Sequence, residues 1–251
     1  IYLNRDYSPY AIKRDNEIIK LSKKNNIKFN DFKDHVLYEK FDITKDDGTP
    51  YKVYTPFSRK WLSRLDSDGI KNYPSEKLTH NFINIKSNFD FNSLGFCEST
   101  ITLTKLNFSK KVIDEYEEKR NFPYKDGTSK IGVHLRFGTV STRKLVRQAK
   151  SSSNITFLKE LVWREFFQQI LFHFPHTVNK SFKPQYDRIE WLNSEDDFTK
   201  WCNGNTGYAL VDAGMRELNK TGFMHNRVRM LVGSFLCKHL LIDWRLSLIH
   251  I

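Results

Sequence analysis

The chain has 251 residues, of which 39% are hydrophobic and 14% aromatic, and this composition excludes an intrinsically disordered protein. Its net charge of +12 favours a polyanionic partner, nucleic acid first and an acidic membrane surface second, although a lysine-rich proteome would give the same charge. Three widely spaced cysteines form neither a CxxC pair nor a disulfide framework, which indicates a reducing compartment.

The first part of the chain predicts a strand, a helix and further short strands. IYLN at 1–4 has strand character, AIKRDNEIIKLSKKN at 11–25 is an amphipathic helix, and IKFNDFKDHVLYE at 27–39 alternates as strands do. A strand–helix–strand order is typical of an α/β sheet, so residues 1–45 are predicted to be the tail of such a sheet. Because the chain opens directly in a strand with Ile1, we expect its beginning to be missing.

Residues 46–97 are predicted to be a linker, because they are rich in Asp, Gly, Pro, Ser and Asn and have few periodic runs. TPFSRKWLSRL, at 55–65, predicts one short helix within it. From residue 98 onward the pattern becomes helical, so the fold class is mostly α, with a small α/β part. The predicted helices are LTKLNFSKKVIDEYEEKRNF (103–122), STRKLVRQAKSS (141–152), FLKELVWREFFQQILFHF (157–174), SEDDFTKWCN (194–203), YALVDAGMRELNKT (208–221) and HNRVRMLVGSFLCKHLLIDW (225–244). Ser141 and Ser194 are expected N-caps, and Gly222 is an expected C-cap.

The predicted helix 157–174 carries charge on an apolar face. Glu160, Trp163 and Arg164 are spaced i, i+3, i+4 and project to one side. The apolar residues predicted to share that face are Phe157, Phe167, Ile170, Leu171 and Phe174. Buried charge is costly unless it is paired or serves a ligand. Either Glu160 and Arg164 form an internal ion pair, or these side chains face a ligand.

Two further segments suggest anion binding. DGTSKIGVHLRFG, at 126–138, places small and hydroxyl residues ahead of a helix-like run, where backbone N–H groups favour phosphate, although an ordinary capped turn would look the same. In the segment 221–230, Arg227 and Arg229 stand at the start of an apolar helix, where they would neutralise a phosphate or a buried carboxylate. The alternative is that they are simply solvated side chains at the start of the helix. Neither GxGxxG nor a Walker A sequence is present.

Several motifs, taken in order, resemble the DNA photolyases. They are NRDYSPYAIKRD, YTPFSRKWL, DGTSKIGVHLRFGTVS, FLKELVWREFFQQILFHFP, NGNTGYALVDAGMRELNKTGFMHNRVRM and FLCKHLLIDWR. Within the photolyase/cryptochrome family, HNRVRM looks most like class I cyclobutane pyrimidine dimer (deoxyribodipyrimidine) photolyases. The resemblance covers residues 1 to about 245, and LSLIHI after Arg245 departs from the family pattern. It therefore implies an internal fragment, which we expect to be inactive and unable to hold its cofactor stably.

The resemblance also implies a domain organisation. Residues 1–45 would be the C-terminal part of a Rossmann-like α/β antenna domain, residues 46–97 the interdomain linker, and residues 98–251 a truncated all-helical FAD-binding domain.

By the same resemblance, one group of residues would hold FAD. Those matching the segment around the FAD phosphates are Tyr116, Thr128, Ser129, Lys130, Ile131 and Gly132. Position 132 is usually Ser in the family, so one hydroxyl contact would be lost there. Arg164, Asn226 and Arg229 would contact the flavin side, with Arg229 pairing with an Asp that this sequence does not contain at the expected place.

A second group would bind the lesion. Glu160 would hydrogen-bond the flipped pyrimidines, Trp163 would stack against them, and Asn226 would contact both flavin and dimer; these three are the expected catalytic residues. Met230 would line the cavity. The DNA phosphates would be held by Arg120 and Arg227.

Trp191 and Trp244 match the outer and middle members of the electron-relaying tryptophans of the family, although ordinary core packing would also explain them. An antenna chromophore of folate or deazaflavin type stays unassigned, because Thr177 and Val178 do not match the family's folate-contacting Cys-Lys pair.

The resemblance thus implies light-driven repair of cyclobutane pyrimidine dimers by electron transfer from reduced FAD, in a monomeric, cytoplasmic, DNA-associated enzyme without a metal or a membrane partner. The alternatives are a blue-light-sensing cryptochrome and a non-catalytic basic DNA-binding helical module. Retention of both Glu160 and Trp163 argues against the first, and the predicted cofactor segment argues against the second.

Overall fold

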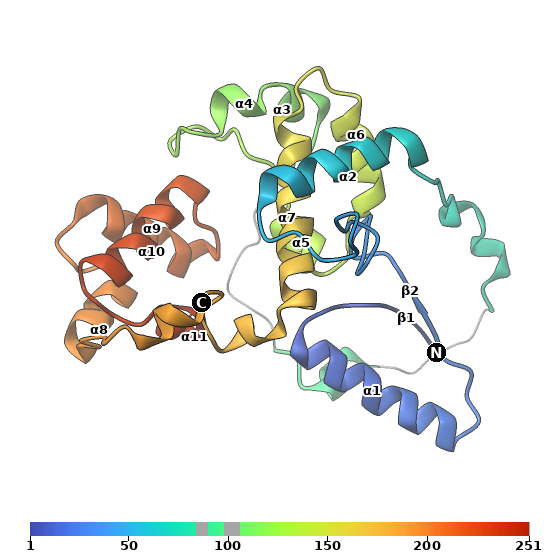
Figure 1. Cartoon of the computed structure of the whole chain (residues 1–251), viewed down its shortest axis with the longest axis horizontal. Helices are drawn as coiled ribbons and strands as arrows, with labels where there is room; N and C mark the ends of the chain where they lie inside the picture. Colours follow the sequence, from blue (N-terminus) through green and yellow to red (C-terminus); the bar gives the residue numbers. More distant parts are fainter. Residues whose placement is uncertain (84–89, 98–105, 251) are drawn as a thin grey trace.

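The computed structural model describes residues 1–83, 90–97 and 106–250, and most of them are helical (Figure 1), which confirms the mostly helical fold class. At the N-terminus, β1 (Tyr2–Asn4) and β2 (Asn30–Phe32) pair in parallel, with Leu3 opposite Asp31, and α1 (Pro9–Lys24) connects them. The predicted strand–helix–strand order is therefore present.

The prediction of several alternating strands over 27–39 is wrong, because only β2 forms there. The physical reason lies in the backbone hydrogen bonds of this segment. The N–H groups of Leu37 and Tyr38 donate to the carboxylate of Glu165 instead of to a neighbouring strand. A side chain from a distant helix thus satisfies the backbone N–H groups of the segment after β2, which would otherwise require a neighbouring strand.

The short helix predicted at 55–65 is present and longer, as α2 (Tyr54–Asp68). It buries Phe57, Trp61 and Leu65 and packs against the central helix α7 (Thr156–His173). Figure 1 shows α2 crossing the upper part of α7. Part of the range predicted to be a linker therefore contributes to the main core, while the domain boundaries themselves stay a prediction.

Short 3-10 turns occupy other parts of the chain; they are η1 (Ser75–Lys77), η2 (Thr79–Asn81), η3 (Phe91–Leu94), η4 (Pro175–Val178) and η5 (Pro184–Arg188).

The continuous helix predicted at 103–122 is wrong for its described part, and residues 98–105 lie outside the described residues. The chain forms two short helices, α3 (Lys110–Asp114) and α4 (Tyr116–Lys119). Before α3, the side chain of Asn107 accepts a hydrogen bond from the Ser109 N–H at 3.3 Å. Such local side-chain bonds offer the backbone an alternative to helix, which delays the helix start.

The remaining helices are α5 (Gly132–Arg136), α6 (Thr142–Lys150), α8 (Glu195–Asn203), α9 (Ala209–Thr221), α10 (Asn226–Lys238) and α11 (Trp244–His250). The predicted caps are confirmed. Ser141 and Ser194 accept hydrogen bonds from N–H groups three residues ahead, and Gly222 ends α9 in a left-handed conformation with φ of +68°.

The helix predicted over 225–244 ends early, at Lys238. Beyond it the backbone turns, Leu241 takes a positive φ of +50°, and its carbonyl accepts the Leu192 N–H at 2.8 Å. This tie to residues that precede α8 takes the chain out of the helix path. The predicted continuous helix is therefore replaced by α10, a turn and α11.

Two hydrophobic cores flank the middle of the molecule. The first joins α2, α6 and α7 to the segment after β2, and the second lies among α8, α9 and α10. Figure 1 shows α8, α9 and α10 grouped to one side of α7. The predicted site residues lie on both groups, so the site depends on how the two cores meet.

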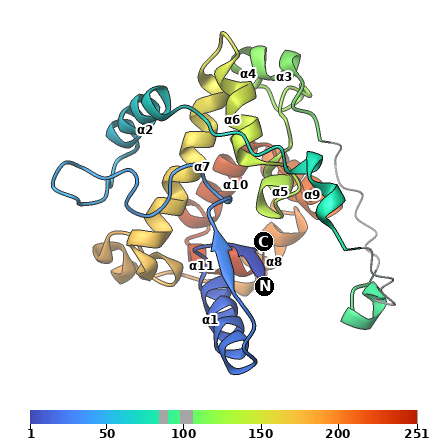
Figure 2. The ribbon, with the colours of Figure 1, turned by 90° about the vertical axis from the view of Figure 1, so that its right-hand side faces the viewer.

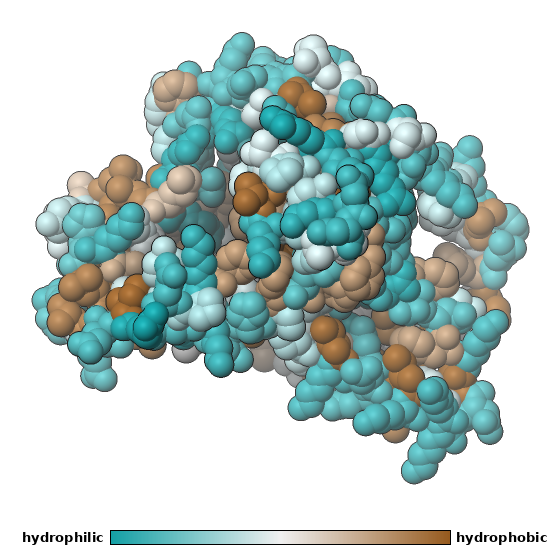
Figure 3. Space-filling model, in the orientation of Figure 1, coloured by the Kyte–Doolittle hydropathy of each residue, from teal (hydrophilic) through white to brown (hydrophobic). Residues whose placement is uncertain are grey.

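The surface in the view of Figure 3 is mostly hydrophilic, with hydrophobic side chains scattered over it. Among the described residues, no helix has the length and apolar character needed to cross a membrane. The same residues contain no group of three or more His, Cys, Asp or Glu side chains that could hold a metal ion.

Candidate functional site

The buried stripe of α7 differs from the predicted one. Its buried residues are Phe157, Leu158, Leu161, Val162, Glu165, Phe166 and Gln169. Phe167, which was predicted to lie inside the apolar face, is 59% exposed, and Glu160, Trp163 and Arg164 are half-buried. Because α2, α4 and α6 all pack on α7, the covered face is rotated toward them. Glu160 and Trp163 therefore lie at the edge of the core, where a large ligand has access.

Glu160 pairs with Arg120, which follows α4, and not with Arg164. The two side chains keep 34% and 24% of their surface exposed. The guanidinium of Arg164 instead donates to the backbone carbonyl of His35 at 2.9 Å and lies against the His35 ring. The alternative interpretation of an internal Glu160–Arg164 ion pair is therefore wrong.

Trp163 lies in a stack of aromatic rings. The Tyr54 ring, at the start of α2, is parallel to the indole, with 3.5 Å between the ring centroids and an angle of 6°. Phe167 lies on the same helix at 5.5 Å. The Tyr54 hydroxyl donates to the carbonyl of Lys159 at 2.9 Å, which fixes the ring relative to α7. Tyr54 was not among the predicted site residues, although it begins the motif YTPFSRKWL.

Tyr116 connects α4 to the same place. Its ring meets Phe157 edge to face at 5.2 Å, and the Arg120 guanidinium lies over it at 5.5 Å. Burial raises the pKa of the Tyr116 hydroxyl, and the negative charge of Glu160 adds to this. Tyr116, Arg120 and Glu160 therefore form one contact group on α4 and α7.

The start of α10 approaches this group from the second core. Arg227 donates to the side-chain oxygen of Asn121 at 2.9 and 2.7 Å through two of its nitrogens. The N-cap His225 is buried and accepts the Arg227 N–H at 3.2 Å. We call Arg120, Asn121, Glu160 and Arg227 the rim group, because their contacts join the two cores at the surface.

Asn226 and Met230 lie beside the rim group on α10. Asn226 is exposed, and its amide lies 4.0 Å from the Met230 sulfur, which is also 3.8 Å from an Arg227 nitrogen. Met230 is 57% exposed. Arg229, one turn from His225, is exposed as well. These three side chains are therefore accessible to a ligand, and their individual roles stay predictions.

The segment 128–132 precedes α5 and also approaches the second core. Ser129 and Ile131 are buried, and Thr128 is half-buried. Lys130 has a positive φ of +52°, pairs with Asp126 at 2.9 Å and places its ammonium 5.6 Å from the Phe223 ring. Gly132 is exposed, and a Cβ added to it would meet open space, so a Ser would also fit there.

Trp191 and Trp244 line one apolar pocket of about 580 Å³, together with Phe166, Phe167 and Cys237. The two tryptophans are half-buried. The two tryptophans thus share a pocket with Phe167, whose ring lies against Trp163. Their predicted role in electron transfer stays a prediction.

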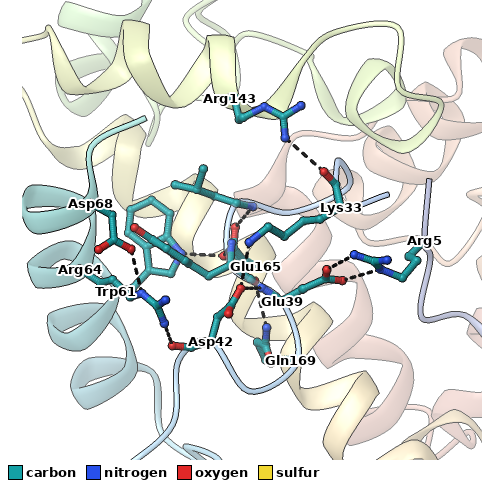
Figure 4. Close-up of polar contacts among 12 residues, drawn as sticks. Arg5, Lys33, Glu39, Asp42, Trp61, Arg64, Asp68, Arg143, Glu165 and Gln169 are labelled. Carbon is teal, nitrogen blue, oxygen red and sulfur yellow. Dashed lines mark hydrogen bonds and ion pairs between the residues drawn. The ribbon is translucent and has the colours of Figure 1, made fainter. Parts of the chain in front are cut away.

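The most deeply buried carboxylate of α7, Glu165, was not among the predicted site residues either. Glu165 is 2% exposed and accepts hydrogen bonds from Leu37 N at 2.8 Å, Tyr38 N at 2.6 Å and the Trp61 indole at 2.8 Å. Figure 4 shows Glu165 between Trp61 and Gln169, and the Gln169 amide donates to the Tyr38 carbonyl. Burial raises the pKa of Glu165 to about 7 against the opposing effect of these donors. The spacing of Leu158, Val162, Glu165 and Gln169 on one helix face was the available sign.

Two family models match the chain: "DNA photolyase" over residues 1–77, and "FAD binding domain of DNA photolyase" over residues 157–250. Deoxyribodipyrimidine photo-lyases of Alkalihalophilus pseudofirmus and Agrobacterium fabrum are 36% and 38% identical to it. The alignments cover 98% and 96% of this chain and 55% of each relative, so the chain spans about half the length of the relatives it matches.

Solved structures agree with this likeness. A crystal structure of a class III photolyase from Agrobacterium tumefaciens matches with a TM-score of 0.75 and 32% identity, over 98% of this chain and 56% of that one. A cryptochrome from Synechocystis matches with a TM-score of 0.73 and 25% identity, over 97% and 56%.

Proposed function

Because the chain belongs to the DNA photolyase family, we propose that its protein is a deoxyribodipyrimidine photo-lyase that repairs cyclobutane pyrimidine dimers in DNA with light. The observation that carries the proposal is the rim group, in which Glu160 pairs with Arg120 and Arg227 bonds the adjacent Asn121, with Trp163 one turn from Glu160 along α7. A carboxylate, an indole and two guanidinium groups are the chemistry that an extruded pyrimidine dimer and its flanking phosphates require. The class I assignment stays a prediction, since one matched structure is a class III photolyase.

DNA binding would exchange partners within the rim group. Arg120 is held by Glu160, yet both side chains remain partly exposed, so a phosphate has access to the guanidinium. Charge-assisted bonds from arginine to phosphate are strong and independent of sequence. A phosphate on Arg120 would release the Glu160 carboxylate, which would then accept hydrogen bonds from the N–H groups of the flipped pyrimidines.

Trp163 would supply the apolar wall for the dimer. Its indole is held from one side by Tyr54, so its orientation is fixed before any base arrives. Phe167 lies near the other side, and its 59% exposure leaves it free to move away. Stacking of a base on an aromatic ring contributes about 1–3 kcal/mol. The aromatic stack therefore favours an extruded pyrimidine over water.

The groups predicted to hold FAD fit an anionic cofactor. Gly132 presents an open backbone at the start of α5, Lys130 and Arg229 add positive charge, and Ser129 places a hydroxyl in a buried position. Arg164 would contact the cofactor only if its guanidinium left His35. When bound, reduced FAD supplies the electron that light transfers to the dimer.

Glu160 would then stabilise the negative charge that develops on the pyrimidines when the electron arrives. A carboxylate at hydrogen-bonding distance fixes the orientation of the bases, and its protonated form would donate a proton toward a reduced pyrimidine. Asn226 and Met230, both exposed beside Arg227, would complete the cavity from α10. We further propose that the protein acts as a monomer on DNA in the cytoplasm.

A binding and illumination experiment separates this function from its two rivals, a light-sensing cryptochrome and a DNA-binding module without catalysis. The protein from the complete reading frame would be mixed with dimer-containing and undamaged DNA of the same sequence, in the dark and in blue light. Only a photolyase should both prefer the damaged DNA and remove the dimer in light. Equal affinity for the two DNAs would contradict the proposal.

A further inference from the structure

The segment between α4 and the predicted phosphate-binding residues forms a rigid turn at the surface. The Lys125 N–H donates to the Phe122 carbonyl at 3.0 Å, and Pro123 occupies the position in such turns that proline favours. Gly127 follows so closely against Lys119 that an added Cβ would lie 2.3 Å from the lysine Cβ. The conformation of residues 122–125 is thus fixed at both ends.

This turn presents aromatic rings to solvent next to a cation. Tyr124, at its apex, is 81% exposed, and Phe122 is 43% exposed. Their rings meet edge to face at 6.0 Å. The Lys125 ammonium lies 4.4 Å from the Phe122 ring and 5.7 Å from the Tyr124 ring. The turn therefore offers two aromatic rings and an ammonium group together to a partner that can stack on them.

The turn also stands beside the rim group. Asn121, the residue before it, accepts two hydrogen bonds from Arg227, and Arg120 precedes Asn121 directly. The exposed rings are therefore tied to the two arginines proposed to hold DNA phosphates. Because residues 120–124 are consecutive, their backbone would set the distance between the exposed rings and the phosphate held by Arg120.

We propose that residues 122–125 are a stacking platform for an unpaired nucleobase of the bound DNA, with Tyr124 as the main contact. The proposal rests on the proposed function, because extruding a dimer leaves bases without their pairing partners. Aromatic rings interleaved with cations are the surface on which single-stranded nucleic acid stacks, and stacking accepts any base. A base within intact duplex is stacked on both faces and offers no ring to Tyr124.

The test uses the FAD-loaded protein from the complete reading frame and a duplex with one cyclobutane dimer. Binding would be measured for wild type, Tyr124→Ala, Tyr124→Phe and the matched control Tyr10→Ala. Tyr10 is 74% exposed on α1, which Figures 1 and 2 place at the opposite end of the molecule from α4. We expect Tyr124→Ala to weaken binding about tenfold, the Phe variant to keep the affinity within about twofold, and Tyr10→Ala to change nothing.

A scan with single abasic sites around the dimer identifies the base. At one position, the abasic site should weaken wild-type binding as much as Tyr124→Ala does, and the two changes together should have no further effect. Two results would overturn the platform if wild type still prefers dimer DNA. One is an equal effect of Tyr124→Ala and Tyr10→Ala, and the other is a scan in which no abasic position removes the effect of Tyr124→Ala. Loss of that preference in wild type would overturn both the platform and the proposed function. Unchanged thermal unfolding midpoints of the variants would show that they fold.

Discussion

Replacing Glu165 with glutamine should destabilise the protein, although glutamine has the same shape. One carboxylate oxygen accepts both the Tyr38 N–H and the Trp61 indole, and the other accepts the Leu37 N–H at 2.8 Å. A glutamine that keeps the first oxygen must direct its NH₂ group at the Leu37 N–H. Two donors would then face each other in a site where the side chain is only 2% exposed.

The size of the effect above pH 7, where the Glu165 carboxylate is ionised in the folded protein, follows from these bonds. A buried donor without an acceptor costs about 1–3 kcal/mol, and a bond to a charged group contributes about 1.5–3 kcal/mol. We therefore expect Glu165→Gln to lower the free energy of unfolding by roughly 2–4 kcal/mol, out of about 5–15 kcal/mol for a typical protein.

The measurement is denaturant unfolding monitored by tryptophan fluorescence, with Glu190→Gln as the matched control on the surface. The midpoint of Glu165→Gln should fall clearly, while that of the control should stay close to wild type. Equal midpoints for the two variants would refute the reasoning that Glu165 holds the segment after β2 onto α7.

Three other outcomes are expected. The pKa of Glu165 is about 7 in the folded protein and 4.5 when unfolded, so between these pH values the folded state binds one proton more than the unfolded state. The stability difference between wild type and Glu165→Gln should therefore decrease by about 3 kcal/mol as the pH rises from 4.5 to 7. Unfolding experiments that give the same difference at every pH would contradict this. Trp163→Ala should weaken binding to dimer-containing DNA by ~1–3 kcal/mol and hardly affect undamaged DNA, whereas equal losses in a titration of both would mean that the indole is only structural. Glu160→Gln should lower the number of dimers repaired per absorbed photon and leave the FAD content nearly unchanged; a variant purified without FAD would instead favour a structural role for Glu160.

Local patterns in the sequence predicted most helices and their caps. Ser141, Ser194 and Gly222 act where the backbone itself needs a partner or a left-handed residue, so neighbouring residues are enough to predict them. The early end of α10 depends on a hydrogen bond between Leu192 and Leu241, which no local pattern reveals.

The site was less predictable because its contacts join distant segments. Glu160 meets Arg120, 40 residues away, and Glu165 meets Leu37 and Tyr38, more than 120 residues away. Helical periodicity gives the existence of α7 but did not give the direction of its buried face, because Glu165 is buried and Phe167 exposed, and residues two positions apart lie on opposite sides of a helix. The resemblance located Glu160, Trp163 and Arg120, while the pairing of Arg120 with Glu160 and the stacking of Tyr54 on Trp163 became visible only in the structure.

The central claim is that this site serves the light-driven opening of pyrimidine dimers, and the most direct test counts dimers. The protein from the complete reading frame, carrying reduced FAD, would be given an oligonucleotide with one cyclobutane dimer, and the products would be separated by chromatography after illumination or darkness. Dimers should disappear only in light, and more slowly with Glu160→Gln. A protein that carries reduced FAD and binds the oligonucleotide, yet leaves the dimers unchanged in light, would contradict it.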